Sequence, residues 1–368
     1  MKRPTMSDVA RLASVSNATV SAVLNDSAAV KDSTRLRVLT AIEQLNYRAS
    51  PTGSSANTSG SRSLGFLIKE IDNPYYAEVV LGAREVAEQH GYSLFVATSE
   101  GEYDSERRAV EQFRGKGIEG LIFAPILHTD TDSSHLFELK RRNYPFVLIE
   151  GVSGLRASLI DVDNTDASRD AVQYLIRRGH TRIVHLSGPP YSLHSQERIE
   201  GVRRACSSSG ILFPDESVIP AGAHLADGYE AGKRYFGACP AESRPTAVTC
   251  YNDLVAIGLC RALAELELRV PENVSIIGWD DIVLAAYLPV PLTTVQMPKS
   301  TMGAIAAEML IRQVESHQSL PPQHAVLSAT LVERSSVRDV GLPCNKGQSS
   351  LDQRRRGVAP GTGAPAVQ

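Results

Sequence analysis

The sequence predicts two fold classes in one chain: an all-α helix-turn-helix head, and an α/β body built from two Rossmann-like parallel sheets. A chain of 368 residues exceeds what one ordinary hydrophobic core organises. The first 48 residues carry apolar side chains at helical spacing. After residue 64, apolar runs alternate with amphipathic helical stretches, which is typical of parallel sheets covered by helices on both faces.

The head, residues 1–48, is expected to contain three helices. The first covers 6–13, and Ser16 caps a second helix that runs to about residue 24. A third helix over about 33–45 is expected to bury Leu36, Val38, Leu39, Ile42 and Leu45. The formal charge of the head is +3, whereas the rest of the chain carries −6. A basic head on an acidic body indicates a polyanion as the partner of the head.

Two segments have no pattern that could build a core. Residues 49–63 are almost entirely small and polar, which predicts a hinge linker. Residues 341–368 are polar and rich in Gly and Pro, and we expect a disordered tail there. The three arginines at 354–356 are interpreted as part of that solvated tail.

The body, residues 64–340, is expected to form two lobes. We assign about 64–160 with 293–320 to one lobe, and about 161–290 with 321–338 to the other. Ligands of such sheets bind at the carboxyl ends of the strands, so a site between the lobes is predicted. The strand candidates are 64–68, 92–98, 120–126, 145–150, 159–163, 182–188, 247–252, 274–279 and 292–297.

Several function classes find no support in the sequence. No apolar run reaches the roughly 18 residues of a membrane span, and the N-terminus lacks a secretory stretch, so we expect a cytoplasmic protein without membrane contact. The five cysteines form no C-x-x-C pair, which argues against disulfides and metal sites. The G-x-G-x-x-G at 115–120 lies between a helix and a strand, the reverse of the dinucleotide-binding order. No catalytic residue, metal or cofactor is therefore predicted.

The second head helix is predicted to be the helix that recognises DNA. Such a helix fits the major groove and presents its N-terminal side chains to base edges. Asn17 and Ala18 occupy these positions. Phosphate contacts suit the neighbouring hydroxyl and amide side chains, because these donate hydrogen bonds to anions. These neighbours are Thr5, Ser16, Thr19, Ser21 and Asn25.

At this point the chain resembles the lactose-repressor/galactose-repressor (LacI/GalR) family over nearly its whole length. The resemblance implies a homodimer that reads a roughly two-fold operator in double-stranded DNA. It also implies an effector domain similar to periplasmic sugar-binding proteins, with a sugar-like small molecule as effector. The matching segments include SDVARLASVSNATVSAVLN, STRLRVLTAIEQLNYR, LGFLIKEIDNPYYAEVVLGAREVAEQHGY, DNTDASRDAVQYLIRRGHTRIVHLSGP, SQERIEGVRRA, RPTAVTCYNDLVAIGLCRAL and VPENVSIIGWDDI.

The resemblance also implies which residues bind the effector. Arg198 matches the arginine that clamps the effector, and it could instead form a structural ion pair with Asp280. A planar guanidinium, carboxylates and an amide together suit the hydroxyls of a sugar, and an aromatic ring suits its apolar face. Trp279 could provide such a ring, and plain core packing is the alternative for Trp279 and Tyr75. The complete predicted set is Tyr75, Tyr76, Glu150, Arg198, Asn252, Trp279 and Asp280.

Two positions depart from the family pattern. Ala22 stands where the family often has a larger polar base reader. Ala56 stands where the family hinge usually inserts a leucine into the minor groove, and alanine cannot open a base step in that way. We therefore hypothesise weaker operator discrimination than is usual for the family.

The predicted function is an effector-controlled transcription regulator, with a repressor favoured. The alternative is a solute-binding protein of a sugar transport system, which would share the body but need a secretion signal and no head. An enzyme on a Rossmann-like fold would need a nucleophile, an acid/base pair or a phosphate loop. Whether the effector releases or promotes DNA binding stays open.

Overall fold

The structure is a computed structural model that describes residues 5–24, 30–45, 61–126, 133–316 and 320–341. The chain divides into two compact units, Met1–Gly60 and Ser61–Gln368. Asn25, Ala56, most of the predicted hinge linker and the predicted tail beyond residue 341 lie outside the described residues. The expectations made for them stay predictions.

The head contains the three expected helices, α1 (Met6–Ala13), α2 (Asn17–Leu24) and α3 (Asp32–Gln44). Thr5 begins α1 with a capping box, in which its hydroxyl meets the Asp8 amide and the Asp8 carboxylate meets the Thr5 amide. A small core of buried apolar residues joins the helices. Its members are Val9, Ala10, Ala13, Val20, Val23, Val38 and Ala41.

The predicted burial of α3 is partly wrong. Leu36 and Leu39 are 68% and 45% exposed, whereas Val38 and Ala41 are buried and Ile42 packs against them. Residues 38, 41, 42 and 45 form one stripe at helical spacing, and this stripe alone faces the core. Leucines at 36 and 39 fall off that stripe, so their hydrophobicity did not predict their position.

The first sheet of the body is entirely parallel. Helices α4 (Pro74–Gln89) and α12 (Lys299–Glu315) pack together beside it, and α5 (Tyr103–Gly115) and α6 (Ser134–Arg141) contribute to a separate core cluster. In spatial order its strands are β11 (His324–Leu327), β5 (Ser158–Val162), β4 (Phe146–Leu148), β3 (Gly120–Phe123), β1 (Ser63–Ile68) and β2 (Ser93–Thr98).

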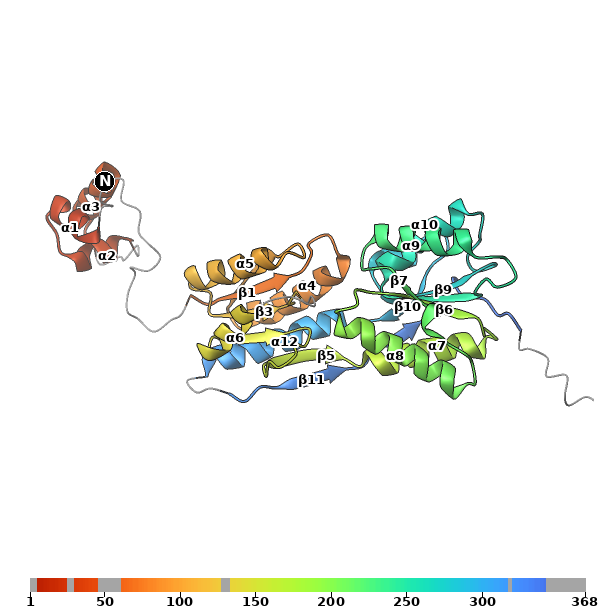
Figure 1. The fold of residues 1–368 in the computed structure, drawn as a ribbon. Helices are drawn as coiled ribbons and strands as arrows, with labels where there is room; N and C mark the ends of the chain where they lie inside the picture. The colour runs from red at the N-terminus through yellow and green to blue at the C-terminus, as the bar shows by residue number, and fades with distance from the viewer. Residues whose placement is uncertain (1–4, 25–29, 46–60, 127–132, 317–319, 342–368) are drawn as a thin grey trace, which may run out of the picture. The chain divides into compact units, whose positions relative to one another are not determined.

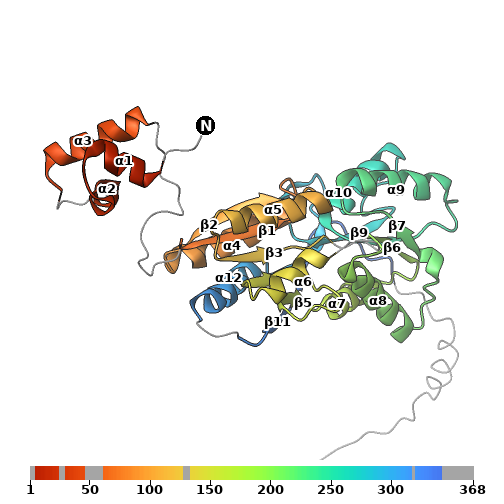
Figure 2. The same ribbon diagram turned by 60° about the vertical axis from the view of Figure 1, so that its left-hand side comes forward.

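The second sheet has the same plan, except that β12 runs antiparallel to β10. Figures 1 and 2 show the two sheets and their helices as two lobes of one body. The strand order is β12 (Thr330–Val332), β10 (Thr293–Gln296), β9 (Ser275–Asp280), β8 (Ala247–Cys250), β6 (Ile183–Ser187) and β7 (Val218–Pro220). The helices of this lobe are α7 (Asn164–Arg177), α8 (Leu193–Ser208), α9 (Leu225–Ala238), α10 (Asp253–Glu265) and α11 (Val283–Tyr287).

The predicted division between the lobes needs a correction. Strand β10, assigned to the first lobe, pairs with β9 in the second sheet, and β11, assigned to the second lobe, pairs with β5 in the first. The chain therefore passes between the lobes three times, after β5, after β10 and after β11. Strand periodicity reports that a segment is buried but not which sheet it joins, because pairing depends on distant residues.

Helices α4 and α12 approach each other closely in the first lobe. A Cβ on Gly303 would lie 1.8 Å from the Val79 carbonyl oxygen, and a Cβ on Gly82 would lie 2.0 Å from that of Ser300. Only glycine permits this helix contact.

None of the helices in the described part of the chain combines the length and the apolar character that a membrane span requires.

Candidate functional site

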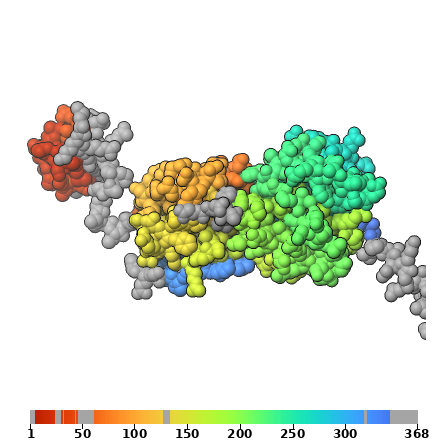
Figure 3. Space-filling view, viewed as in Figure 1, coloured from red at the N-terminus to blue at the C-terminus, as the bar shows by residue number. Residues whose placement is uncertain are grey.

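A cavity of about 630 Å³ lies between the two lobes of the body. The space-filling view separates the lobes by colour, with orange and yellow on one side and green and cyan on the other (Figure 3). Lys69, Glu150 and Asp280 line it from the carboxyl ends of β1, β4 and β9, as predicted for ligand sites of parallel sheets. Six of the seven predicted effector residues line this one cavity: Tyr75, Tyr76, Glu150, Arg198, Asn252 and Asp280.

Arg198 is buried and tightly held on α8. Its Nε donates to Asn164 Oδ1 at 3.1 Å, and its Nη1 donates to the Tyr251 carbonyl oxygen. The guanidinium lies over the rings of Tyr251 and Trp279, at 4.7 and 4.2 Å from their centroids. No ion pair joins Arg198 to Asp280 in the described ranges, so the alternative of a structural ion pair finds no support. Aromatic rings and neutral acceptors thus hold the guanidinium in place.

Trp279 does not line the cavity, which corrects its predicted role as a sugar platform. Its side chain is 3% exposed, and its indole N–H points to Met297 Sδ at 3.1 Å. Strand β9 directs this ring behind the Arg198 guanidinium, because the strand is buried on both faces. Trp279 therefore supports Arg198 from behind, and the core-packing alternative describes it better.

Asp280 ends β9 and lines the cavity from the second lobe, in an uncommon backbone conformation. Its φ is 102° and that of Asp281 is 53°, both in the region that favours glycine. Burial raises the pKa of the Asp280 carboxyl to about 6, while Arg198, Lys299 and His194 limit the rise. Two consecutive strained residues at a ligand cavity are typical of a functional site.

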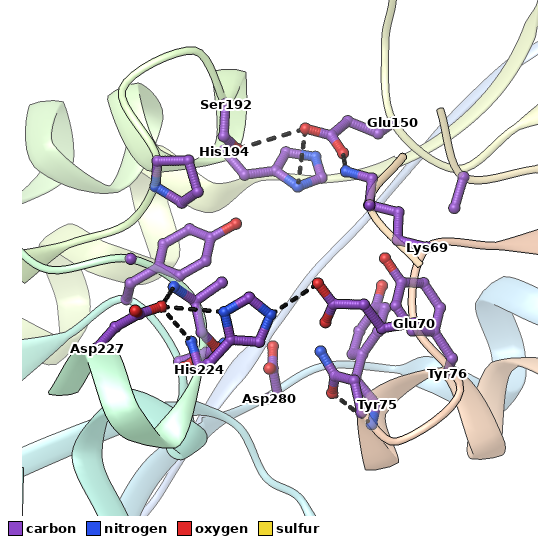
Figure 4. Close-up of a pocket in the computed structure, with 18 of the residues that line it drawn as sticks. Lys69, Glu70, Tyr75, Tyr76, Glu150, Ser192, His194, His224, Asp227 and Asp280 are labelled. Atoms are coloured by element: carbon purple, nitrogen blue, oxygen red, sulfur yellow. Dashed lines mark hydrogen bonds and ion pairs between the residues drawn. The ribbon is translucent and has the colours of Figure 1, made fainter. Parts of the chain in front are cut away.

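Glu150 lies on the opposite wall, ion-paired with Lys69 (Figure 4). Ser192 donates to it at 3.4 Å, and His194 Nδ1 lies 4.0 Å away, both from the second lobe. Burial raises the pKa of Glu150, but Lys69, His194 and Ser192 outweigh this and keep it below its ordinary value. Glu150 is thus an anion whose charge is already compensated. Lys69 was not predicted as a site residue, although it directly follows the apolar strand β1.

The two tyrosines enter the cavity from the N-terminal turn of α4. Their rings meet edge to face, with centroids 5.2 Å apart. The Tyr75 hydroxyl points to Met302 Sδ at 3.6 Å, and Asn73 caps the helix by accepting from the Tyr75 amide. Both rings are therefore fixed surfaces of the cavity, and the core-packing alternative for Tyr75 accounts for only part of its surroundings.

Asn252 lines the cavity while its amide organises the second lobe. Its Oδ1 accepts from the Val255 amide as the N-cap of α10, and its Nδ2 donates to the Ala223 carbonyl oxygen, both at 2.8 Å. These two hydrogen bonds already use the side-chain oxygen of Asn252 and one of its amide protons. The geometry does not test its predicted contact with an effector, which stays a prediction.

A bridge across the lobes was not predicted. His224 of the second lobe meets Glu70 of the first lobe through Nε2 at 2.8 Å, and Asp227 through Nδ1 at 3.0 Å (Figure 4). Burial lowers the pKa of His224, but the two carboxylates outweigh it and raise the pKa above its ordinary value. Glu70 and His224 are 154 residues apart, so no spacing in the sequence could have linked them.

The head presents its predicted reading positions to solvent. Asn17 and Ala18 are exposed at the start of α2, and Ser16 caps this helix by accepting from the Thr19 amide at 3.1 Å. Thr19 and Ser21 are half-buried. The Thr5 hydroxyl is bonded to Asp8, so a phosphate would have to share it.

Among the residues that the structure describes, no group of three or more His, Cys, Asp or Glu side chains is arranged so that it could hold a metal ion. The four described cysteines, Cys206, Cys239, Cys250 and Cys260, are free thiols.

Two family models match the chain. Residues 5–50 match the bacterial regulatory proteins of the lacI family, and residues 172–337 match a periplasmic binding protein-like domain. The first match falls on the helix-turn-helix head and the second on the body, which agrees with the two units of the structure.

Single relatives align with both the head and the body of this chain. The ribose operon repressor of Escherichia coli K12 is 34% identical over 335 residues, which is 90% of this chain and 99% of that protein. A complex of the transcriptional regulator CelR with cellobiose superimposes with a TM-score of 0.69 at 28% identity, over 91% of this chain and 100% of the other. The Lac repressor dimer bound to operator and the anti-inducer ONPF shares the fold, with a TM-score of 0.68 at 24% identity over 92% and 100% of the two chains. The chain belongs to the LacI family of DNA-binding, effector-regulated transcriptional repressors, which are not enzymes.

Proposed function

We propose that this chain is an operator-binding repressor, and that its effector is an uncharged sugar or sugar derivative held between the two lobes. One observation carries the proposal: the buried Arg198 is stacked on Tyr251 and Trp279 beside a cavity that Asp280 enters from the same lobe. A fixed guanidinium and an ionisable carboxylate can bind adjacent hydroxyl groups from both sides. The ribose operon repressor and the cellobiose complex among its relatives support this ligand class.

The charge of the cavity favours an uncharged ligand over a phosphorylated one. The cations Lys69 and Arg198 line it, and Lys69 is paired with Glu150, while His224 is paired with Glu70 and Asp227. Six carboxylates line the cavity as well, so negative charge stays in excess after these pairs are counted, and a phosphate group would face its repulsion. These carboxylates belong to Glu70, Asp72, Glu100, Glu150, Asp227 and Asp280.

The proposed assembly is a homodimer that reads a two-fold operator. Strand β2 lies at an edge of its sheet and exposes Phe95 and Val96, and Leu81 on α4 is also exposed. In the second lobe, α11 exposes Val283, Leu284 and Tyr287. Exposed apolar side chains of this size mark interaction surfaces, and a second copy of the chain would cover them. In the Lac repressor structure a dimer holds the operator.

Control of DNA binding would follow from lobe movement. A ligand that touches both lobes favours the arrangement in which its contacts are complete, and it shifts the DNA affinity only through that difference. The two recognition helices of a dimer must reach successive major grooves, about 34 Å apart. A modest change in dimer geometry would therefore weaken binding at both half-sites. Because the protein would act on an operator, we expect it in the cytoplasm.

A thermal-shift screen of the full-length protein tests this proposal. The panel contains free sugars, sugar phosphates, purines and polyols, because a ligand of the native state raises its apparent stability. We expect a free sugar to raise the melting temperature and to change binding of an operator fragment. A sugar phosphate or purine that acts in place of every free sugar would contradict the proposed ligand class.

A further inference from the structure

Lys299 occupies an unusual place for a lysine. It is the first residue of α12, directly after the chain passes from β10 of the second lobe into the first. Its side chain is 2% exposed. A buried ammonium group is costly unless its protons have acceptors, and fully buried lysines are rare for that reason.

The ammonium group makes two hydrogen bonds and one ion pair. Lys299 Nζ donates to the carbonyl oxygens of Asp280 at 2.6 Å and Asp281 at 2.8 Å, and it lies 3.3 Å from Glu78 Oε1. The two carbonyls belong to the last residue of β9 and the residue after it, in the second lobe, and Glu78 belongs to α4 in the first. Lys299 therefore ties the two lobes together where the chain crosses from β10 to α12.

The two carbonyls are those of the strained residues. Asp280 and Asp281 both have positive φ, a conformation that non-glycine residues keep only where the surrounding structure enforces it. The neighbouring contacts hold the segment at other atoms. Ile282 donates its amide to Asp253 at 2.9 Å, and Arg334 pairs with the Asp281 carboxylate at 2.7 Å. Lys299 is the described side chain whose bonds reach the main chain of both aspartates.

We propose that Lys299 is a positioning residue for the effector site, which holds the main chain of Asp280 and Asp281 so that the Asp280 carboxylate faces the cavity. The inference rests on the proposed function, because it treats the cavity as the effector site. Through Glu78, the same ammonium group connects this carboxylate to α4, the helix that begins with Tyr75 and Tyr76. Effector contacts from the two lobes thus share one support.

The electrostatics agree with this arrangement. Burial raises the pKa of Asp280, and Arg198, Lys299 and His194 oppose the rise. Asp253 is the other buried acid nearby, and burial together with Asp280 raises its pKa to about 8. Losing the Lys299 charge should therefore move the ionisation of Asp280 to higher pH.

Two measurements on the intact protein without effector test the proposal. In Lys299→Met, which keeps an unbranched side chain but no donors, we expect amide exchange in the 280–284 segment to accelerate about tenfold or more. We also expect the ionisation of Asp280 to move upward from about pH 6. It is followed through the aspartate 13Cγ resonance that disappears in Asp280→Asn.

Lys233→Met is the matched control, because Lys233 pairs with Glu265 at 3.4 Å on the surface of the second lobe. It should leave both readings at the wild-type values. If Lys299→Met does not fold, Lys299→Gln replaces it, since its shorter neutral side chain loses the charge and at least one carbonyl bond. Unchanged exchange in the 280–284 segment, or unchanged ionisation of Asp280, overturns the proposal. Neither reading needs an effector, so this failure is distinct from a failed sugar screen.

Discussion

At the scale of single residues, some side chains line the cavity and other groups hold them in place. Arg198 lines the cavity, while Asn164, Trp279 and the main-chain carbonyl of Tyr251 fix its orientation. The same division applies to Asp280 and Lys299. A guanidinium fixed in advance loses little conformational freedom on binding, which increases its contribution to affinity.

Replacing Arg198 tests the clamp. Arg198→Ala should abolish the effector response, with effector affinity falling about 100-fold or more as charge-assisted hydrogen bonds are lost. Basal operator binding should persist, because the head is a separate compact unit. Titration of an operator fragment with and without effector measures both. Arg198→Lys should fail similarly, since an ammonium group cannot keep both the stacking and the fork. A full response in Arg198→Ala would mean that the effector binds elsewhere.

The Glu70–His224–Asp227 bridge predicts a pH dependence. Both ring nitrogens of His224 face carboxylates, so only the protonated imidazole donates to both. Its pKa is raised in the folded protein, so the stabilisation is complete below the ordinary histidine pKa and is lost as pH rises through the raised value. The gap in melting temperature between wild type and His224→Gln should therefore be largest below the ordinary histidine pKa and shrink as pH rises through the raised value. His324→Gln on the exposed edge strand β11 is the control, and a gap independent of pH would contradict the prediction.

At the scale of elements, close contact between two helices depends on small residues at particular positions. The pattern of apolar and polar residues that predicts a helix does not distinguish these positions from others. Gly82 and Gly303 let α4 and α12 touch, yet both lie inside helices, where glycine is unfavourable. The same limit explains α3, where Val38 and Ala41 face the core and two larger leucines do not. The register of a helix on its neighbour is decided by shape and not by hydrophobicity alone.

Glycine replacement measures this contact. Gly303→Ala should destabilise the body by about 1–3 kcal/mol, because its Cβ would meet the Val79 carbonyl oxygen. Gly115→Ala on α5 is the matched control, since nothing lies within 4 Å of its Cβ. Urea denaturation followed by the single tryptophan, Trp279, compares the two variants. Equal stability of the two would show that α4 and α12 can move apart freely.

At the scale of the whole molecule, the proposed dimer joins effector binding to operator binding. A charge inside its interface should separate the subunits. Val283→Asp combined with Leu284→Asp is expected to give monomers. Operator binding should weaken at least about 100-fold, because a monomer has a single head and cannot contact the second half-site. Analytical ultracentrifugation and operator titration measure the two effects. Leu212→Asp, at a side chain 86% exposed, is the control and should change neither. A dimer that survives the double change would place the interface on another surface.

The hinge hypothesis also belongs to this scale. If Ala56 limits operator discrimination, Ala56→Leu should increase the affinity ratio between operator and unrelated DNA, because leucine can wedge into a base step. Parallel titrations at one salt concentration measure this ratio. Wild-type protein that already kinks its operator and discriminates fully would refute the hypothesis.

The sequence by itself determined the two fold classes, the helix-turn-helix head and six of the residues that line the cavity. Helical spacing, strand composition and family motifs are local signals, and strands that end at one sheet edge bring their following residues together. Only the tertiary structure decided the rest. It placed β10 and β11 in their sheets, put Trp279 behind Arg198, paired Glu70 with His224, and brought the Lys299 ammonium group to the Asp280 carbonyl. These contacts join residues whose partners lie far along the chain, and burial and shape across the lobes select them, which no local pattern records.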